Sequence, residues 1–383
     1  MKILYVLGSF FPAQNGGPNN TTYWAASELV KRGVDVSVIS LKDGLTSSNL
    51  EDYDLVLGLE NNLNGIRAWY FDYVGSRYFS RGMFLWLILN IRKYDMVNLT
   101  SVFFPWTWVA ALICIYYRIP FSIAPRGELE PGAYRFGNKL KDLINILFLK
   151  KLMSKARFVL VTSEQEANYS RPYFPQKMAF ETVPNFMDFE GHKTRSKSIS
   201  KRRDILYLGR IHPKKGIENL INAFNLLDSE ILGSHHLLIV GGGDEDYIKS
   251  LKERASSSER ADLIHFLGHR TGEEKSQIYG AAKVMVLPSF SENFGNVVVE
   301  ALFQSTPVIA SRYTPWGGLE TAGCGSWVDN DPKSLAMALE SILSLDEEAY
   351  SLMTEVSRRF VTENYDVRQN GGELERLFRS YLR

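Results

Sequence analysis

Short apolar runs alternate with longer segments of mixed polarity along the whole chain. The first run is continuously apolar, which is typical of a parallel strand covered on both faces, and the segments between runs are long enough for helices. The runs that we interpret as strands lie at residues 3–8, 34–40, 55–59, 96–99, 121–124 and 158–162, and then at 204–208, 237–240, 263–267, 284–287 and 308–310. We therefore expect an α/β protein with doubly wound parallel sheets.

The chain length and a break in this pattern indicate two domains. A chain of 383 residues is too long for one ordinary core and fits two domains of roughly 150–200 residues each. Residues 191–203 are rich in Lys, Arg and Ser, which is typical of an exposed linker. We expect a first domain over 1–188, a linker over 189–203 and a second domain over 204–365.

Composition and charge narrow the class of protein. With 45% hydrophobic and 23% charged residues the chain is a folded globular protein, and its formal net charge of +1 implies no general affinity for nucleic acid. Residues 67–157, however, contain 14 Lys and Arg against 5 Asp and Glu. Of the 53 residues from Trp69 to Phe121, 16 are aromatic. This basic, aromatic segment predicts an anionic or membrane-associated partner.

Cysteines and apolar segments bear on the compartment. The two cysteines, Cys114 and Cys324, form no disulfide framework or thiolate metal site, which fits a reducing compartment. The N-terminal apolar run resembles the core of a signal peptide, but no small-residue cleavage site follows it, so we interpret it as a buried strand. The apolar segments 85–91 and 102–117 are shorter than the roughly 20 residues of a membrane span.

Two carboxylates lie around one helix start in the stretch 287–311. A polar loop carries Glu292, and an apolar helix over about 294–304 carries Glu300. Eight helical residues turn through about 800°, so both carboxylates face one ligand only if Glu292 lies in the loop. Backbone N–H groups at 293–296 would favour anions and hydroxyl oxygens, and carboxylates accept bonds from sugar hydroxyls. This chemistry suits a phosphorylated sugar; the alternative is a dipole-complementing acid and a solvated helix position.

Two cations follow the first strand of the second half. The run at 204–208 leads into Gly209–Gly216, which contains Arg210 and, five residues later, Lys215 at a helix start. Two cations and free backbone N–H groups at one point suit a pyrophosphate. The alternative is a pair of solvated cations.

Two loops of the first half are further candidates. Gly16 and Gly17 follow the first strand, but they do not form G-x-G-x-x-G and no acid ends the second strand, which argues against nicotinamide binding. Arg126 and Glu128 directly follow the run at 121–124, where ligands meet open α/β sheets. A flexible turn at the glycines and a surface ion pair between Arg126 and Glu128 are the alternatives.

The second-half motifs together resemble a known family. Glu292-x₇-Glu300, within S-E-N-F-G-N-x₃-E-A after a strand that ends in Pro-Ser, resembles the signature of the retaining family 4 glycosyltransferases, which have the GT-B fold. The resemblance covers the second half closely and the first half more loosely. It implies two Rossmann-like domains facing each other across a cleft, with the acceptor in the first, the nucleotide sugar in the second, and a last helix, 366–383, returning to the first. Residues 183–188 resemble the family's crossing between domains, with Phe186 in place of the more usual glycine.

The resemblance assigns a role to each candidate residue. Arg210 and Lys215 would neutralise the departing diphosphate, while Glu292 would orient the transferred sugar and Glu300 would hold the ribose hydroxyls. Other donor-binding candidates are Gly16, Gly17, Arg270, Asn293, Phe294, Gly295 and Asn296. Arg126 and Glu128 are the acceptor-side candidates, and Trp316 is either the floor of the donor site or a core residue.

Other features of the sequence bear on the mechanism. Many members of the family carry a histidine in the first-domain cleft, but residues 98–101 contain none; in a front-face mechanism the leaving phosphate can accept the proton instead, with Glu128 as a second candidate. We expect no metal cofactor, because the histidines have no paired metal spacing and the Asp-x-Asp pairs at 52/54, 244/246 and 329/331 recur by chance or by helix capping, as at Asp331-Pro332.

The resemblance, together with these residues, implies a retaining, metal-independent glycosyltransferase that moves a sugar from a nucleoside-diphosphate sugar to a hydroxyl of a glycan or lipid-linked glycan. A sugar-nucleotide 2-epimerase of the same fold and a non-catalytic sugar-nucleotide-binding subunit are the alternatives. The apolar and basic positions of residues 139–155 alternate with helical spacing; such a helix either lies on anionic lipid or packs on its own sheet. We expect a cytoplasmic protein at the cytosolic face of the membrane, active in cell-surface polysaccharide or glycoconjugate synthesis.

Overall fold

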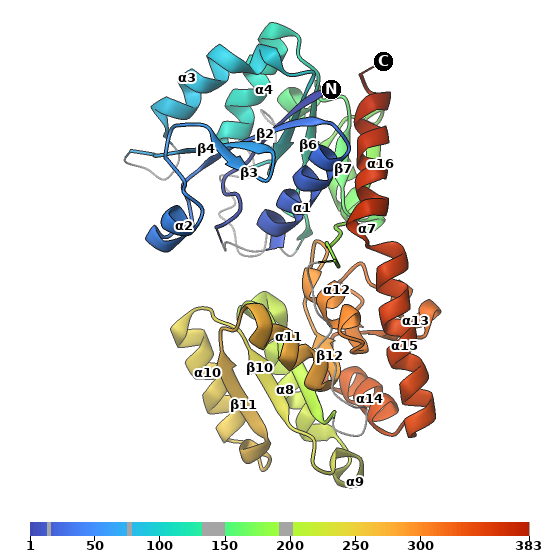
Figure 1. Ribbon diagram of the computed structural model, residues 1–383. Helices are drawn as coiled ribbons and strands as arrows, with labels where there is room; N and C mark the ends of the chain where they lie inside the picture. The colour runs from blue at the N-terminus through green and yellow to red at the C-terminus, as the bar shows by residue number, and fades with distance from the viewer. Residues whose placement is uncertain (14–16, 75–78, 132–149, 191–201, 383) are drawn as a thin grey trace. The chain divides into compact units, whose positions relative to one another are not determined.

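The protein folds into two compact units. The computed structural model describes residues 1–13, 17–74, 79–131, 150–190 and 202–382 (Figure 1). The first unit comprises Met1–Asp188 together with Val367–Arg383, and the second comprises Phe189–Asp366. Each unit has its own sheet, and the chain therefore passes from the first unit to the second and back.

The first unit is built on an eight-stranded sheet in the order β3-β4-β2-β1-β5-β6-β7-β8. Its neighbouring strands pair in parallel except β3, which pairs antiparallel with β4. The strands are β1 (Lys2–Val6), β2 (Asp35–Leu41), β3 (Asn61–Leu63), β4 (Ile66–Phe71), β5 (Met96–Thr100), β6 (Phe121–Ala124), β7 (Val159–Val161) and β8 (Phe180–Thr182). Chain order reverses between β1 and β5, so this is the topological switch point, where open α/β sheets bind ligands.

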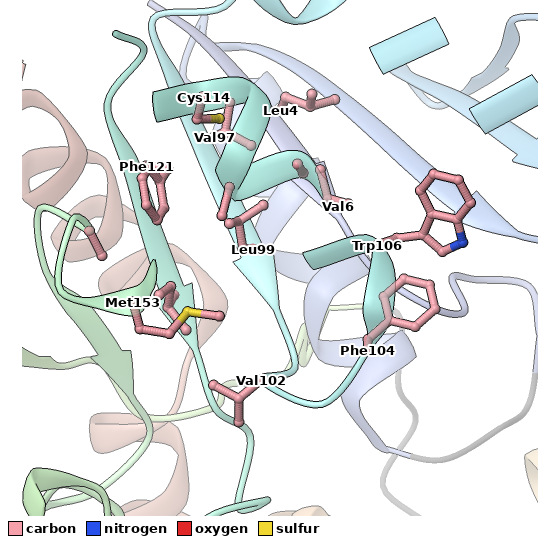
Figure 2. Close-up of a cluster of buried hydrophobic side chains, with 14 of the residues drawn as sticks. Leu4, Val6, Val97, Leu99, Val102, Phe104, Trp106, Cys114, Phe121 and Met153 are labelled. Carbon is pink, nitrogen blue, oxygen red and sulfur yellow. The ribbon is translucent and has the colours of Figure 1, made fainter. Parts of the chain in front are cut away.

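Helices cover both faces of this sheet. They are α1 (Gly17–Lys31), α2 (Ser47–Asp52), α3 (Arg81–Asn90), α4 (Pro105–Tyr117), α7 (Glu164–Ser170) and α16 (Val367–Ser380), with short 3₁₀ turns η1 (Ile91–Lys93) and η2 (Arg171–Tyr173). Leu4 and Val6 of β1 pack with the buried residues of α3 and α4, whereas Ile3 and Tyr5 pack with those of α1 and α16. Figure 2 shows the first cluster, in which α4 meets β1 and β5. Alternate side chains of β1 therefore point to opposite faces of the sheet and belong to two separate hydrophobic cores.

Helix α16 is part of the first unit although it follows the whole second unit in the chain. Phe378 is fully buried and packs its ring edge against Tyr5, with centroids 6.4 Å apart. The helix approaches α1 so closely that a Cβ on Gly371 would lie 2.4 Å from Cγ of Glu28. Close helix contact therefore depends on a residue without a side chain at this position.

The second unit is built on a six-stranded parallel sheet in the order β11-β10-β9-β12-β13-β14. The strands are β9 (Asp204–Leu208), β10 (Leu237–Val240), β11 (Ile264–Gly268), β12 (Ala282–Leu287), β13 (Val308–Ser311) and β14 (Gly325–Val328). The helices are α8 (Ile217–Leu226), α9 (Ser229–Leu232), α10 (Glu245–Ser256), α11 (Gly272–Ala281), α12 (Asn296–Phe303), α13 (Gly318–Ala322), α14 (Pro332–Leu343) and α15 (Glu347–Asn364), with 3₁₀ turns η4 (Pro213–Lys215) and η5 (Ala261–Leu263). This is the strand order 3-2-1-4-5-6 of a Rossmann fold, with its switch point between β9 and β12.

The strand expected at 55–59 is a loop instead, and the strand of this region is β4. Val56 and Leu59 are exposed, and the side chain of Asn61 bonds the backbone of both, including a 2.7 Å bond from Val56 N–H. A side chain that satisfies nearby backbone groups favours a local turn over a sheet ladder. The longer buried run Ile66–Phe71 takes the place beside β2.

At each described end of the linker expected over 189–203, one residue is buried and its neighbour is exposed. Phe189 is buried and stacks on Phe303, with ring centroids 4.6 Å apart. Arg202 is buried too, and its guanidinium donates to the carbonyls of Gln304 and Ser305 just beyond α12. A cation at a helix C-terminus complements its dipole and its free carbonyls. Arg202 therefore has a structural role, although it belongs to a segment rich in Lys and Arg.

The structure bears on two expectations about membrane contact. None of the described helices is both long and apolar enough to cross a membrane. Most of the basic helix expected at 139–155 lies outside the described residues, and of its last residues Leu152 and Met153 are buried in the core.

Cys114 and Cys324 are free and buried, and burial raises the pKa of both thiols.

Candidate active site in the second unit

The loop after β9 carries the two predicted cations. His212 caps the turn η4 by accepting the N–H of Lys214 on Nδ1 at 3.2 Å, which turns the chain so that Lys215 ends η4. The hydroxyl of Tyr207 donates to the carbonyl of Arg210 at 2.8 Å, and the side chain of Arg210 is exposed. Arg210 and Lys215 therefore stand on one short, braced loop at the carboxyl end of a central strand.

The loop after β12 is held directly against this first loop. Phe290 N–H donates to the carbonyl of Lys214 at 2.8 Å, and Asn330 donates to the carbonyl of Pro288 at 2.6 Å. A Cβ on Gly216 would lie only 2.1 Å from the Pro288 carbonyl oxygen. Because β9 and β12 are neighbours at the switch point, these contacts join the two loops at the place where Rossmann folds bind ligands.

Lys215 and Glu292 form an ion pair across the two loops. Their side chains are only 12% and 14% exposed, so solvent screens the pair less than a surface pair. An ammonium group has three donors, and the carboxylate uses one of them here. The pair fixes Glu292 in the loop before α12, which is the position it needs if it and Glu300 are to face one ligand. The two remaining donors of Lys215 can bind a further anion.

Helix α12 begins at Asn296 after a glycine cap. Gly295 has φ 86°, a left-handed conformation that glycine adopts without strain, and a Cβ there would lie 3.1–3.2 Å from Leu287, Glu292 and Trp316. Glycine offers no side chain to bond the first N–H groups of the helix, and no side-chain cap is present. These groups and the positive end of the helix dipole therefore lie next to Glu292 in sequence, with Asn293 in the loop between them.

Phe294 and Trp316 support this loop from below. Trp316 is almost fully buried and donates its indole N–H to the carbonyl of Phe294. The Phe294 side chain is buried as well and packs on Trp316 and Tyr365. Of the two interpretations of Trp316, the core residue is the right one, and the side chain of Phe294, expected at the donor, lies in the core instead because burial of its ring anchors the loop.

Glu300 lies inside α12 and is held by two residues of α11. Tyr279 OH donates to Oε2 of Glu300 at 2.7 Å, and Lys275 Nζ lies 2.7 Å from the same oxygen. Among the described residues no bond ends on Oε1, and the side chain is 21% exposed. Burial and the Glu300 carboxylate raise the pKa of Tyr279 well above its usual value, so its hydroxyl remains a donor. Glu300 thus keeps Oε1 available as a hydrogen-bond acceptor.

The charges of these loops act on one another. Burial and the neighbouring cations Arg210, Lys214 and Lys215 lower the pKa of His212. Burial, followed by the charge of Glu292, raises the pKa of Tyr207. The charges of the two loops therefore shift the pKa values of Tyr207 and His212. Such shifts are common where charged side chains gather at a functional site.

The loops after β10 and β11 continue the same edge of the sheet. Gly209 N–H bonds the carbonyl of Val240 at 3.0 Å, and Gly241 N–H bonds that of Gly268 at 2.9 Å. Arg270 follows β11 by two residues; its guanidinium lies 3.6 Å from Glu274 and bonds the carbonyl of His269. Arg270 thus lies on the expected loop, but both of these contacts are with residues close to it in the chain.

The first-unit candidates form a different arrangement. Glu128 accepts bonds from Ser101 Oγ and Val102 N–H at 2.6 Å each and from Phe103 N–H at 3.1 Å. Burial nevertheless raises the pKa of Glu128. Arg126 donates to Asn185 Oδ1 at 2.9 Å. The surface ion pair proposed for these two residues is therefore wrong, and Glu128 holds the loop after β5 instead of offering a free carboxylate to an acceptor.

Sequence reasoning missed the residues that support these candidates. Glu166 is buried below the 126–128 loop and accepts from Gly127 N–H, Thr162 N–H and the Thr162 hydroxyl at 2.7–2.9 Å. Gly17 is the first residue of α1, and Gly16 lies outside the described residues. Glu166, like Lys275 and Tyr279, sits in an ordinary helical pattern, so no local signal marks it.

The described residues contain no group of three His, Cys, Asp or Glu side chains that could hold a metal ion. Asp244 and Asp331 cap α10 and α14 instead: each accepts backbone N–H groups of the first turn at 3.0 Å. Pro332 occupies the first turn of α14. Helix capping is thus confirmed for these two Asp-x-Asp pairs.

Comparisons with known proteins now identify the family. Residues 188–359 match the family Glycosyl transferases group 1, and residues 15–190 match Glycosyltransferase Family 4. A D-inositol 3-phosphate glycosyltransferase of Mycobacteroides abscessus is 36% identical over 346 residues, which cover 80% of this chain and 71% of that protein. The chain belongs to the family 4 glycosyltransferases.

This family 4 glycosyltransferase is also similar to two further proteins. Over 111 residues, or 28% of each protein, it is 35% identical to O-antigen chain mannosyltransferase B of Escherichia coli. The crystal structure of HepE from Anabaena with UDP and glucose superimposes with a TM-score of 0.76 over 99% of this chain and 100% of that chain, at 17% identity. The glycosyltransferase accordingly has the GT-B fold, as its sequence predicts.

Proposed function

We propose that this glycosyltransferase moves a sugar from a nucleoside-diphosphate sugar to a hydroxyl of a glycan or lipid-linked glycan, with retention at the anomeric carbon and without a metal ion. The observation that carries the proposal is the meeting of Arg210, Lys215, Glu292 and the start of α12 at the switch point of the second unit. A diphosphate and a sugar need cations and hydroxyl acceptors together, and these loops supply both.

The proposed roles follow from where negative charge develops. As the sugar–phosphate bond breaks, the leaving diphosphate gains charge and the sugar becomes oxocarbenium-like. Lys215, held by Glu292, and the exposed Arg210 would stabilise the diphosphate electrostatically. Glu292 and the backbone N–H groups beside it would orient the sugar, while Oε1 of Glu300 would accept from the ribose. In a front-face reaction the leaving phosphate takes the acceptor proton, and no protein base is required.

The similar proteins guide the choice of substrates. HepE was crystallised with UDP and glucose, one relative is a D-inositol 3-phosphate glycosyltransferase, and another acts on the O-antigen chain. These support a nucleotide sugar as donor and a polyol or a growing cell-surface glycan as acceptor. We propose a protein of the cytoplasm that works at the cytosolic face of the membrane, where lipid-linked glycans are extended.

The donor is tested first by thermal unfolding. The protein is heated with UDP, GDP and ADP and with their sugars, and the true donor raises the apparent Tm because it binds only the folded state. Donor and lipid extract are then incubated with EDTA, and NMR follows the anomeric proton of the product. Retention in EDTA is the expected result. Inversion, or activity that returns only with Mg²⁺, contradicts the proposal; conversion of the donor without acceptor assigns a 2-epimerase, and binding without turnover assigns a binding subunit.

Lys215→Ala tests the leaving-group role. We expect kcat to fall by roughly 10²–10³, the scale for removing one preorganised charge-stabilising donor. Lys249→Ala, on the exposed side of α10, is the matched control and should leave kcat unchanged. The Tm of each variant without donor, compared with that of the unchanged protein, confirms that it folds. A loss of less than about threefold for Lys215→Ala would refute the role.

A further inference from the structure

Helices α3 and α4 present an apolar surface to solvent on one side of the first unit. They lie side by side over one face of the sheet (Figure 1). Met83 and Leu87 of α3 and Cys114 of α4 fill the core below them. We define the apolar patch by the large hydrophobic side chains that remain exposed on these two helices, namely Phe84, Leu85, Leu89, Leu112, Ile115 and Tyr116.

These two helices lack the polar face that surface helices carry. Arg81 is the single charged residue of α3, and α4 has none in 13 residues. By contrast α10, also on the surface, carries six charged residues in 12. A helix that is apolar all round is normally buried on all sides, and a contiguous exposed apolar patch marks an interaction surface.

Exposed cations lie at both ends of α3 and at the C-terminal end of α4. Arg81 begins α3, Arg92 and Lys93 follow it, and Arg118 caps α4, all of them exposed. The guanidinium of Arg92 lies over the ring of Tyr117 with 4.7 Å to the centroid. Among residues 79–121 the single acid is Asp95, which bonds the backbone N–H of Lys2.

We propose that the apolar patch docks on an anionic lipid surface, with α3 and α4 lying in the plane of the interface. Apolar side chains enter the acyl boundary while the flanking cations meet lipid phosphates, and aromatic residues favour this depth. The 13 residues of α4 give about 20 Å of helix, too short for a hydrocarbon core of about 30 Å. The docking itself does not depend on the proposed function; only its link to a lipid-linked acceptor rests on that function.

Charge decides between a membrane and a second copy of the chain. A symmetric dimer through this face would place the patch against itself and would bring the same flanking cations of both copies close together. Like charges across an interface cost free energy, whereas anionic headgroups are complementary to them. The observations therefore favour lipid as the occupant.

Vesicle flotation tests the docking surface without donor or acceptor. The probe is the full chain with vesicles of phosphatidylcholine alone or mixed equally with phosphatidylglycerol. We expect binding to the mixed vesicles only, and a loss of roughly tenfold or more for the double variant Leu89→Glu with Tyr116→Glu. The pair Arg81→Glu with Lys93→Glu should lose roughly fivefold or more for each exchanged cation, and high salt should do the same.

A matched control separates the patch from net charge. Met337→Glu with Leu352→Glu changes two apolar side chains of α14 and α15 that are 71% and 61% exposed, against 68% and 80% for Leu89 and Tyr116. This control should bind as the unchanged protein does. Equal loss in both pairs, no binding to mixed vesicles, or a dimer in solution that Leu89→Glu with Tyr116→Glu dissolves would overturn the proposal. Donor-induced thermal stabilisation, which depends on the second unit, reports separately on the proposed function.

Discussion

Glu300 illustrates how the bonds that a carboxylate makes within the protein can all fall on one of its two oxygens. Tyr279 and Lys275 both bind Oε2, and no described residue binds Oε1. The α11 residues therefore fix the orientation of the carboxylate and leave Oε1 as the oxygen that we propose accepts from a ligand hydroxyl. If Glu300 binds the ribose as we propose, we expect both residues to affect that binding without touching the ligand.

Lys275→Met tests this positioning role. Losing a hydrogen bond to a charged group should weaken binding of the ribonucleoside diphosphate by roughly tenfold or more, measured by calorimetry. Binding of the 2′,3′-dideoxy analogue should not change, because it offers Glu300 no hydroxyl. Lys249→Met is the control. Equal losses for both nucleotides would show that the lysine acts only as a nearby charge.

We expect His212 to make the stability of the second unit depend on pH. Its pKa in the folded protein is lowered from 6.5 by burial and by the neighbouring cations, so the unfolded chain binds the proton more readily. The free energy of unfolding should therefore fall as the pH falls below about 6.5 and level off below the folded pKa. His212→Asn keeps an acceptor for the cap and should remove this slope, as denaturant titrations across pH would show. An unchanged slope would assign it to other groups.

At the scale of elements, the sequence predicts what is local and misses what depends on distant partners. Strand, loop and helix around Glu292 follow from one apolar run, a polar loop and an apolar helix, and around Lys215 from a run and a glycine-rich turn. The error at 55–59 arose because Asn61 satisfies the backbone there. Arg202 reads as linker because its carbonyl partners lie about 100 residues away in the chain.

Gly216 tests whether contact between the two loops builds the site. Gly216→Ala would place a Cβ 2.1 Å from the Pro288 carbonyl in a backbone with φ 64°. We expect overpacking and strain together to lower the free energy of unfolding by more than about 3 kcal/mol, with loss of donor binding. Gly323→Ala has the same sign of φ with no atom within 4 Å, and should cost only about 1–2 kcal/mol. Equal costs would show that the close approach is unimportant.

At the scale of the whole molecule, two separate cores predict two unfolding events. Phe378 of α16 and Phe224 of α8 are both fully buried, one in each unit. Each exchange to alanine removes roughly 3–5 kcal/mol from its own unit. In calorimetry, Phe378→Ala should lower one transition and Phe224→Ala the other, and the nucleotide should raise only the transition that Phe224→Ala lowers. Identical effects of the two variants would indicate one cooperative molecule.

The position of α16 constrains how the chain acquires its fold during synthesis. Residues 367–380 complete a core that otherwise comes from residues before 189, and the entire second unit is translated between them. The side of the first sheet that Phe378 covers must therefore stay bare on the ribosome until about 180 further residues have emerged, at roughly 5–20 residues per second. An early-synthesised domain that finishes late needs protection from aggregation in that interval, and chaperones would meet it there.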